Sequence, residues 1–173
     1  VALNKDGAAL LDSVMEHGLR ELSPNELEEI VESEGALVLD TRAPQTFKDG
    51  FVPGSINIGI KGDFAPWLGT LVTDIRQPIV IVADDGAEQE VVTRMSRVGY
   101  DNGRGFLKGG FAAWKAAGKD VDQIESIPAQ ELSDRRKQGA LKIFDVRKSS
   151  EWEGAHLEDA EHISLAEIND HMT

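Results

Sequence analysis

The sequence contains no cysteine in its 173 residues. Within this stretch it therefore has no disulfide, no thiolate metal ligand and no thiol nucleophile, because each of these needs the side-chain sulfur. Basic residues are also scarce: 18 lysines and arginines stand against 31 aspartates and glutamates, for a formal net charge of −13. This balance disfavours contact with nucleic-acid phosphates and anionic membrane surfaces, so we expect neither nucleic acid nor a membrane as a partner.

Long apolar runs are missing as well. No run approaches the roughly 20 residues that a membrane span needs, and the N-terminus shows no basic stretch followed by an apolar core. We therefore expect a cytoplasmic protein. With 40% apolar and 28% charged residues, the composition is that of an ordinary globular protein. The length allows one domain of roughly 100–150 residues and a smaller part.

The chain contains a partial copy of itself at a spacing of 105 residues. Residues 22–60 align with residues 127–165 without a gap, and Thr173 falls opposite Leu68. Both copies contain an apolar pair that runs into Asp-x-Arg, namely Asp40 with Arg42 and Asp145 with Arg147. An aromatic residue follows each arginine after five positions. A period of this length indicates a repeated domain rather than a solenoid, and the second copy is expected to be incomplete.

Strands and helices alternate in the predicted first copy. Ser23-Pro24-Asn25-Glu26 is typical of a capping box that opens a helix, and Gly35 is expected to end it. Residues 36–39 and 55–60 form short strand candidates. The four β-branched residues at 79–82 favour a strand buried on both faces, and the apolar spacing at 88–98 favours a helix. Further elements are a helix at 8–16, a strand near 105–107 and a helix at 111–117. Together they predict an α/β fold with a mainly parallel sheet covered by helices on both faces.

Four sequence blocks resemble the rhodanese family in order and spacing. They are residues 40–47, 50–55, 79–98 and 107–114. In that family the first two blocks usually read Asp-x-Arg, Glu-Phe and Gly-His-Ile-Pro-Gly-Ala, and the last reads Gly-Gly-x-x-x-Trp. The second copy retains Glu151-Trp152 and His156-Leu157. The resemblance implies a rhodanese-like parallel sheet flanked by helices, followed by a partial second copy.

Two flanking segments resemble a narrower group, in which a metallo-β-lactamase-fold persulfide dioxygenase is fused to two rhodanese-like domains. They are residues 2–7 with the following Leu10-Leu11, and residues 64–71. The implied organisation is an N-terminal helical segment at 1–20, a rhodanese-like domain at 21–119, a linker at 120–125 and the N-terminal part of a second domain at 126–173. The metal ligands of such a dioxygenase would lie upstream of this chain.

The rhodanese loop normally carries Cys-x-x-Gly-x-Arg between a strand and a helix. There, backbone N–H groups lower the thiol pKa and bind an anionic substrate. Alignment of its glycine with Gly86 places Ala83 at the cysteine position and Glu88 at the arginine position. A methyl group cannot attack sulfur, and a like charge at about 4 Å opposes an anion by roughly 1–4 kcal/mol. The resemblance therefore implies a degenerate active-site loop. Its residues are Ala83, Asp84, Asp85, Gly86, Ala87 and Glu88.

The acidic residues of this loop have two interpretations. They are more commonly caps of a helix N-terminus than ligands of a divalent cation, and the Asp-x-Asp-x-Asp-Gly spacing of a calcium loop is missing. Asp40, Arg42, Asp145 and Arg147 are predicted to be structural ion pairs that hold the loop after the first core strand. The histidines, for example His156 and His162, lack metal-ligand spacing. We expect no metal and no cofactor.

Three functions compete at this point. The first is a non-catalytic rhodanese-like module, a structural or docking part of a larger persulfide- or sulfide-metabolising protein. The second is a fragment of an active sulfurtransferase or persulfide dioxygenase fusion whose catalytic residues lie outside this chain. The third is a cation-dependent or carboxylate-dependent hydrolase built on the acidic loop. The expected partners are a metallo-β-lactamase-fold domain, the remainder of the second rhodanese-like domain, or a second copy of the chain.

Overall fold

The computed structural model describes residues 7–139 and 141–171, and it divides into two compact units. The first unit is Val1–Glu125 and the second unit is Ser126–Thr173. Residues 2–6, part of the segment that resembles the end of a dioxygenase domain, lie outside the described residues.

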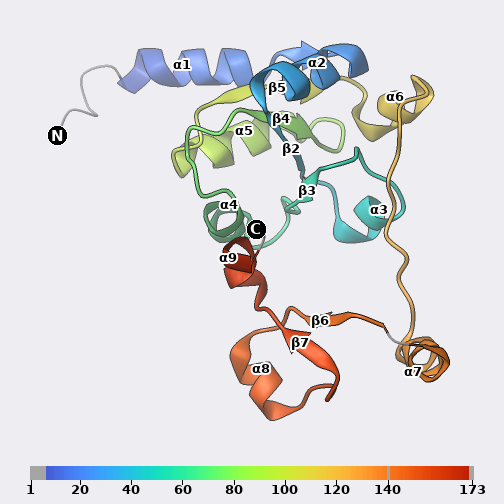
Figure 1. Ribbon diagram of the computed structural model, residues 1–173. Coiled ribbons are helices and arrows are strands. Elements are labelled where there is room, and N and C mark those ends of the chain that lie inside the picture. The colour runs from blue at the N-terminus through green and yellow to red at the C-terminus, as the bar shows by residue number, and fades with distance from the viewer. Residues whose placement is uncertain (1–6, 140, 172–173) are drawn as a thin grey trace. The chain divides into compact units, whose positions relative to one another are not determined.

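The first unit is a five-stranded parallel sheet with helices on both faces (Figure 1). Its strands are β1 (Glu21–Leu22), β2 (Leu37–Asp40), β3 (Ile56–Asn57), β4 (Ile79–Val82) and β5 (Gly103–Leu107). Its helices are α1 (Gly7–Gly18), α2 (Pro24–Glu34), α3 (Pro44–Lys48), α4 (Phe64–Leu71), α5 (Glu88–Arg97) and α6 (Gly110–Ala116). The strand order is β1-β5-β4-β2-β3, which confirms the predicted α/β fold.

Strand β4 lies at the centre of the sheet because all four of its residues are apolar. Their exposed fractions are all 0%. Ile79 and Ile81 pack with residues of α1, α4 and α5 on one face, and Val80 and Val82 pack with residues of α2 and α6 on the other. A strand that is buried on both faces needs an uninterrupted apolar run, as the sequence predicted.

Helix α2 begins and ends where the sequence predicted. The Glu26 backbone N–H donates to Ser23 Oγ at 3.3 Å, and the Ser23 backbone N–H donates to Glu26 Oε2 at 2.9 Å. The hydrogen bonds that the Glu26 carboxylate accepts from the Ser23 backbone N–H and the Ser23 hydroxyl lower the pKa of Glu26. Gly35 ends the helix with a φ of 63°, a left-handed conformation that glycine adopts without steric cost.

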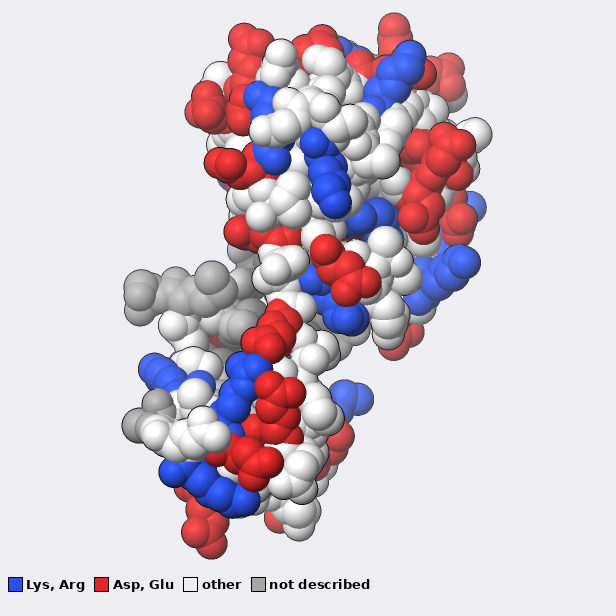
Figure 2. Space-filling model, turned by 90° about the vertical axis from the view of Figure 1, so that its right-hand side faces the viewer, with Lys and Arg blue, Asp and Glu red and all other residues white. Residues whose placement is uncertain are grey.

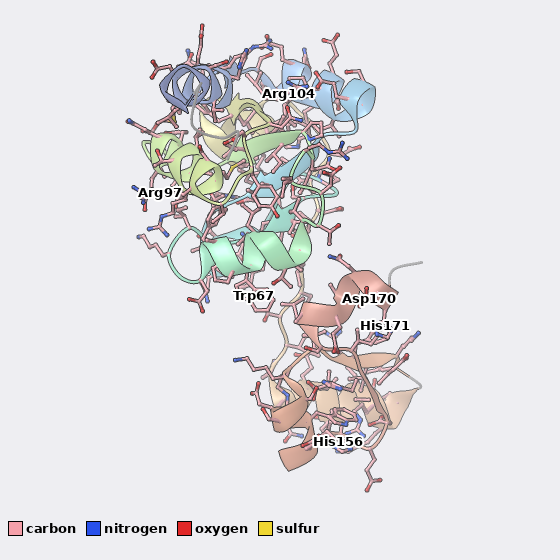
Figure 3. The ribbon with its side chains drawn as sticks, turned by 90° about the vertical axis from the view of Figure 1, so that its left-hand side faces the viewer. Trp67, Arg97, Arg104, His156, Asp170 and His171 are labelled. Carbon is pink, nitrogen blue, oxygen red and sulfur yellow. The ribbon has the colours of Figure 1, made fainter. Side chains whose placement is uncertain are left out.

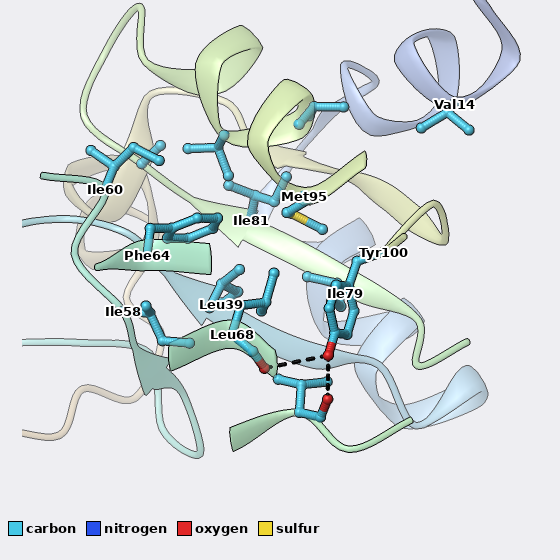
Figure 4. Packing of buried hydrophobic residues seen from close by; sticks show 14 residues of the cluster. Val14, Leu39, Ile58, Ile60, Phe64, Leu68, Ile79, Ile81, Met95 and Tyr100 are labelled. Atoms are coloured by element: carbon cyan, nitrogen blue, oxygen red, sulfur yellow. Dashed lines mark hydrogen bonds between the residues drawn. The ribbon is translucent and has the colours of Figure 1, made fainter. Parts of the chain in front are cut away.

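Tyr100 joins α4 to the core on one face of the sheet (Figure 4). Its ring is buried, and its hydroxyl donates to the Val72 carbonyl oxygen at 2.5 Å and more weakly to that of Leu68 at 3.4 Å. Burial raises the pKa of Tyr100 above its ordinary value of 10.

Tyr100→Phe is expected to lower the free energy of unfolding by about 1 kcal/mol, because a buried carbonyl loses its donor. Since the folded-state pKa of Tyr100 is raised, the stability from the neutral phenol is complete below about pH 10 and is lost as the pH rises further. Urea unfolding at neutral and alkaline pH measures both effects. Ser33→Ala, which removes an exposed hydroxyl, is the control. Equal losses from the two variants would contradict the role given to Tyr100.

Residues 120–125 form hydrogen bonds with the first unit. Phe51 and Asp122 form an isolated antiparallel bridge, and the Ile124 N–H donates to the Lys48 carbonyl oxygen at 2.8 Å. Trp114 Nε1 donates to the Asp120 carbonyl oxygen at 2.7 Å. The segment expected as a linker is therefore hydrogen-bonded to the first unit over most of its length.

The second unit repeats the first part of the first unit. Its elements are α7 (Ala129–Gln138), β6 (Ile143–Asp145), α8 (Ser149–Gly154), β7 (Ala160–His162), the 3-10 turn η1 (Leu165–Glu167) and α9 (Ile168–His171). At the spacing of 105 residues, α7, β6, α8 and β7 correspond to α2, β2, α3 and β3. β6 and β7 are parallel, as β2 and β3 are. None of the described helices in either unit is both long and apolar enough to cross a membrane.

Candidate functional site

The 83–88 loop lies at the carboxyl end of the central strand. Thr41, at the end of β2, donates to the Val82 carbonyl oxygen through its backbone N–H at 2.8 Å and its hydroxyl at 3.2 Å. These bonds hold the ends of β2 and β4 together. The loop then turns at Gly86, whose φ is 82°, while the Ala87 N–H donates to the Asp84 carbonyl oxygen at 3.0 Å. In parallel α/β sheets this edge is where ligands bind.

Ala83 occupies the first position of the loop, and its side chain is buried, with an exposed fraction of 6%. A Cβ added to Gly110 would lie 3.1 Å from the Ala83 carbonyl oxygen, so the first turn of α6 packs closely against this position. A side chain at residue 83 is thus held by the sheet and by a neighbouring helix. Alanine provides no nucleophile at this well-fixed position.

The acidic side chains of the loop do not cap α5. Ala87 is its N-cap residue and no side chain makes a capping hydrogen bond there, so the predicted capping role is wrong. Alanine has no acceptor, and the turn is closed by backbone atoms instead. Glu88 and Glu90 still lie in the first turn, and Arg94 and Arg97 lie in the last (Arg97 is labelled in Figure 3). Both pairs complement the helix dipole.

A hollow of about 260 Å³ opens beside this loop. Its lining residues are Thr41, Ala43, Pro44, Gln45, Gly59, Ile60, Lys61 and Asp84. Lys61 and Asp84 carry opposite charges, and the Thr41 hydroxyl donates a hydrogen bond to the Val82 carbonyl oxygen. The lining therefore offers neither a thiol nor a basic cluster for an anion. Across residues 7–139 and 141–171, no three histidine, aspartate or glutamate side chains are grouped in a way that could hold a metal ion.

The buried ion pair beside the loop joins Asp40 to Arg42. Arg42 Nη2 lies 2.6 Å from Asp40 Oδ2, Arg42 Nε lies 3.0 Å from both carboxylate oxygens, and the exposed side-chain fractions are 6% and 0%. Arg42 Nη2 also donates to the Gly50 carbonyl oxygen at 2.9 Å, and its guanidinium lies 4.5 Å from the Phe111 ring centroid. The pair ties the end of β2 to the chain that follows α3, and neither Asp40 nor Arg42 lines the hollow.

A model of the rhodanese-like domain matches residues 23–117, more than half of the 173 residues. The chain belongs to the rhodanese-like domain family. The matched range runs from α2 to the last helix of the first unit, and it includes four of the five strands, the 83–88 loop and the buried ion pair.

Relatives of this rhodanese-like chain agree with the assignment. It is 28% identical over 99 residues to the thiosulfate sulfurtransferase GlpE of Shewanella oneidensis, covering 57% of this chain and 94% of the relative. Among solved structures, it resembles the Alr3790 protein of Anabaena sp., with a TM-score of 0.52, 21% identity, and coverage of 68% of this chain and 90% of that one. It also resembles the BH2092 protein of Bacillus halodurans, with a TM-score of 0.52, 17% identity, and coverage of 69% of this chain and 92% of that one. These two structures support the fold alone.

The second unit of the rhodanese-like chain reproduces the ion pair bond for bond. Arg147 Nη2 lies 2.5 Å from Asp145 Oδ2 and 2.9 Å from the Ala155 carbonyl oxygen, which stands where Gly50 stands in the first unit. The Arg147 side chain is 45% exposed, however. Hydrogen bonding from Arg147 lowers the pKa of Asp145 to about 2.

The free energy of unfolding of the second unit is expected to fall as the pH is lowered from 4 to 2. Because the folded-state pKa of Asp145 is depressed from 3.8 to about 2, the stability that its carboxylate gives is complete above about pH 4 and is lost as the pH falls. The indole N–H signal of Trp152 in NMR spectra reports this loss. In Asp145→Asn the stability should already be reduced at neutral pH, and its acid dependence over this range should be weaker. An unchanged profile in that variant would contradict the assignment.

A stack of aromatic side chains in the second unit was not predicted from the sequence. The Trp152 ring lies 3.7 Å from His156 and 4.9 Å from His162 between centroids, with interplanar angles of 14° (Figure 3 labels His156). The first unit has Phe47 stacked on Phe51 at the positions of Trp152 and His156. His162, from β7, replaces Asn57 and is within 2.9 Å of the Arg147 carbonyl oxygen. The stack is therefore an aromatic packing feature with one additional histidine.

Proposed function

We propose that the first unit is a non-catalytic rhodanese-like module, a structural or docking part of a larger protein of persulfide or sulfide metabolism. The observation that carries the proposal is Ala83 at the carboxyl end of β4. Sulfur transfer in this fold needs a thiolate there, as the family resemblance implies. The methyl group of alanine forms no persulfide, and no cysteine exists elsewhere in the chain to replace it.

The charge of the loop supports the same proposal. Glu88 stands at the position where the family pattern has arginine, and Asp84 and Asp85 are exposed beside it. A carboxylate at this point repels an anion such as thiosulfate by roughly 1–4 kcal/mol at about 4 Å. On the face shown in Figure 2, lysine and arginine side chains are interspersed with acidic ones and do not form a continuous basic surface.

A second candidate is a protein whose active sulfurtransferase or persulfide dioxygenase centre lies outside residues 1–173. The second unit favours it, because β6, β7 and the Asp145–Arg147 pair have the same arrangement as their counterparts in the first unit. No strand and loop that correspond to β4 and the 83–88 loop are described between residues 126 and 171. The partners would be a metallo-β-lactamase-fold domain preceding residues 1–20, or the rest of a second rhodanese-like domain.

Transfer of sulfur from thiosulfate to cyanide tests the first proposal. We expect the 173-residue chain to form no thiocyanate above the protein-free background. The same assay on a longer gene product that contains an intact second loop separates the two candidates, since activity there with none in this chain favours the second.

A further inference from the structure

The two units differ in how their first core strand is paired. In the first unit, β2 has β3 on one edge and β4 on the other, with Leu37 opposite Ile79 and Asp40 opposite Val82. In the second unit β6 is paired with β7, and no other strand is described in its sheet within residues 126–139 and 141–171. The edge of β6 that corresponds to the β4 side of β2 is therefore open. An open strand edge presents backbone donors and acceptors that can pair with another chain.

The side chains around this edge are exposed where their counterparts are buried. Exposed fractions of the pairs, first unit against second, are 0% for Leu39 and 44% for Phe144, 2% for Thr41 and 43% for Val146, 6% for Ala36 and 42% for Leu141, and 3% for Val52 and 37% for Leu157. Four apolar side chains gathered around one open strand edge mark an interaction surface.

The first unit shows what covers such an edge. Leu39 packs in one cluster with Ile79 and Ile81 of β4 and with Val91, Val92 and Met95 of α5, while Val52 packs on the other face with Val80 and Val82. One strand–turn–helix segment thus pairs the edge and contributes to burial on both faces. Since β6 and β7 repeat the parallel pairing of β2 and β3, an added strand in the same orientation meets the same backbone groups.

We infer that the open edge of β6 binds a polypeptide segment outside residues 1–173 that has the chemistry of β4 and α5. This segment is a parallel strand of consecutive aliphatic residues, followed by a polar turn and an amphipathic helix. The inference goes beyond the function proposed for the first unit and names a partner for the second unit. Main-chain hydrogen bonds give such strand addition its affinity, and apolar side chains on both faces select the strand.

A second copy of the chain does not fit this edge as well. Strand β4 of another copy is fully buried in the centre of its own sheet, so its donation would require the first unit to unfold. Pairing of two β6 strands would cover the edge for only three residues, Ile143–Asp145. It would bring no helix of the α5 kind to cover Phe144.

Binding of a labelled synthetic peptide with the sequence of residues 77–99 to the full chain tests the inference. We expect a saturable rise in fluorescence anisotropy, and at least tenfold weaker binding to Phe144→Asp and to Val146→Asp, because a charge is introduced next to the added strand. Leu11→Asp changes a residue of the first unit that is 49% exposed and should bind the peptide as the unaltered chain does. A peptide carrying Ile81→Asp should fail to bind.

Three results would overturn the inference. The first is the absence of saturable binding of the peptide. The second is binding of the peptide to Phe144→Asp and Val146→Asp as tight as to the unaltered chain. The third is a dimer in sedimentation experiments that Phe144→Asp dissociates. The last result would identify a second copy as the occupant. None of them bears on sulfur transfer by the first unit, so failure here is distinguishable from failure of the proposed function, which thiocyanate formation reports.

Discussion

Arg42→Met is expected to lower the free energy of unfolding of the first unit by about 3–5 kcal/mol, the usual cost of removing one partner from a buried ion pair. The substitution leaves the Asp40 carboxylate, whose exposed side-chain fraction is 0%, without its cation. It also removes the donor to the Gly50 carbonyl oxygen and the guanidinium that lies over Phe111. Urea unfolding followed by the fluorescence of Trp114, a buried residue of this unit, measures the change.

The internal repeat offers a matched control for this result. Arg147→Met removes the same hydrogen bonds in the second unit, but there the arginine side chain is 45% exposed and water replaces the lost partner. We expect a loss of no more than about 1 kcal/mol, in line with exposed ion pairs. The double variant Asp40→Leu with Arg42→Met should recover much of the stability, since it leaves no unpaired buried charge. Equal losses from Arg42→Met and Arg147→Met would show that burial does not decide the effect.

Ala83→Cys is expected to create a thiol at the position of the family nucleophile without creating an efficient sulfurtransferase. Asp84, Asp85 and Glu88 make the loop itself negatively charged, and like charges disfavour the thiolate. Combining Ala83→Cys with Glu88→Arg should lower the thiol pKa by one unit or more, because repulsion becomes attraction and about 1.4 kcal/mol corresponds to one unit. Thiocyanate formation should rise at least tenfold from the single to the double variant.

The absence of other cysteines makes this measurement direct, since any thiolate absorbance in the ultraviolet belongs to the introduced residue. The matched control combines Ala83→Cys with Glu153→Arg, which changes the net charge by the same amount in the second unit. We expect it to titrate and react as the single variant does. If Glu153→Arg lowered the thiol pKa as much as Glu88→Arg, the local charge of the loop would not be the cause.

Much of the sheet could be predicted from the sequence, because its signals are local. Four β-branched residues in a row define β4, and the capping box at Ser23 defines the start of α2. Helix α4 and strand β1 were not predicted. The segment Phe64–Leu71 contains Pro66 and Gly69 and lacks polar residues at helical spacing; proline is tolerated here because it lies in the first turn. β1 has two residues, and only its pairing with β5 identifies it.

The residues of the candidate site could be predicted from the sequence, but the contacts that they make could not. The position of Ala83 follows from its place after β4, and the alternation of acids and small residues in the loop is visible in the sequence. The capping role expected of the acids was wrong, because the turn closes through backbone atoms. The stack of His162 on Trp152 brings β7 against α8. Such a contact depends on tertiary structure, which the spacing of residues does not contain.

The most direct test of the account is the rate at which the unaltered 173-residue chain transfers sulfur from thiosulfate to cyanide, with the combined Ala83→Cys and Glu88→Arg variant measured in parallel. We expect thiocyanate at the protein-free level for the unaltered chain and detectable thiocyanate formation for the variant. Turnover by the unaltered chain above that level would contradict the claim that alanine at residue 83 abolishes transfer.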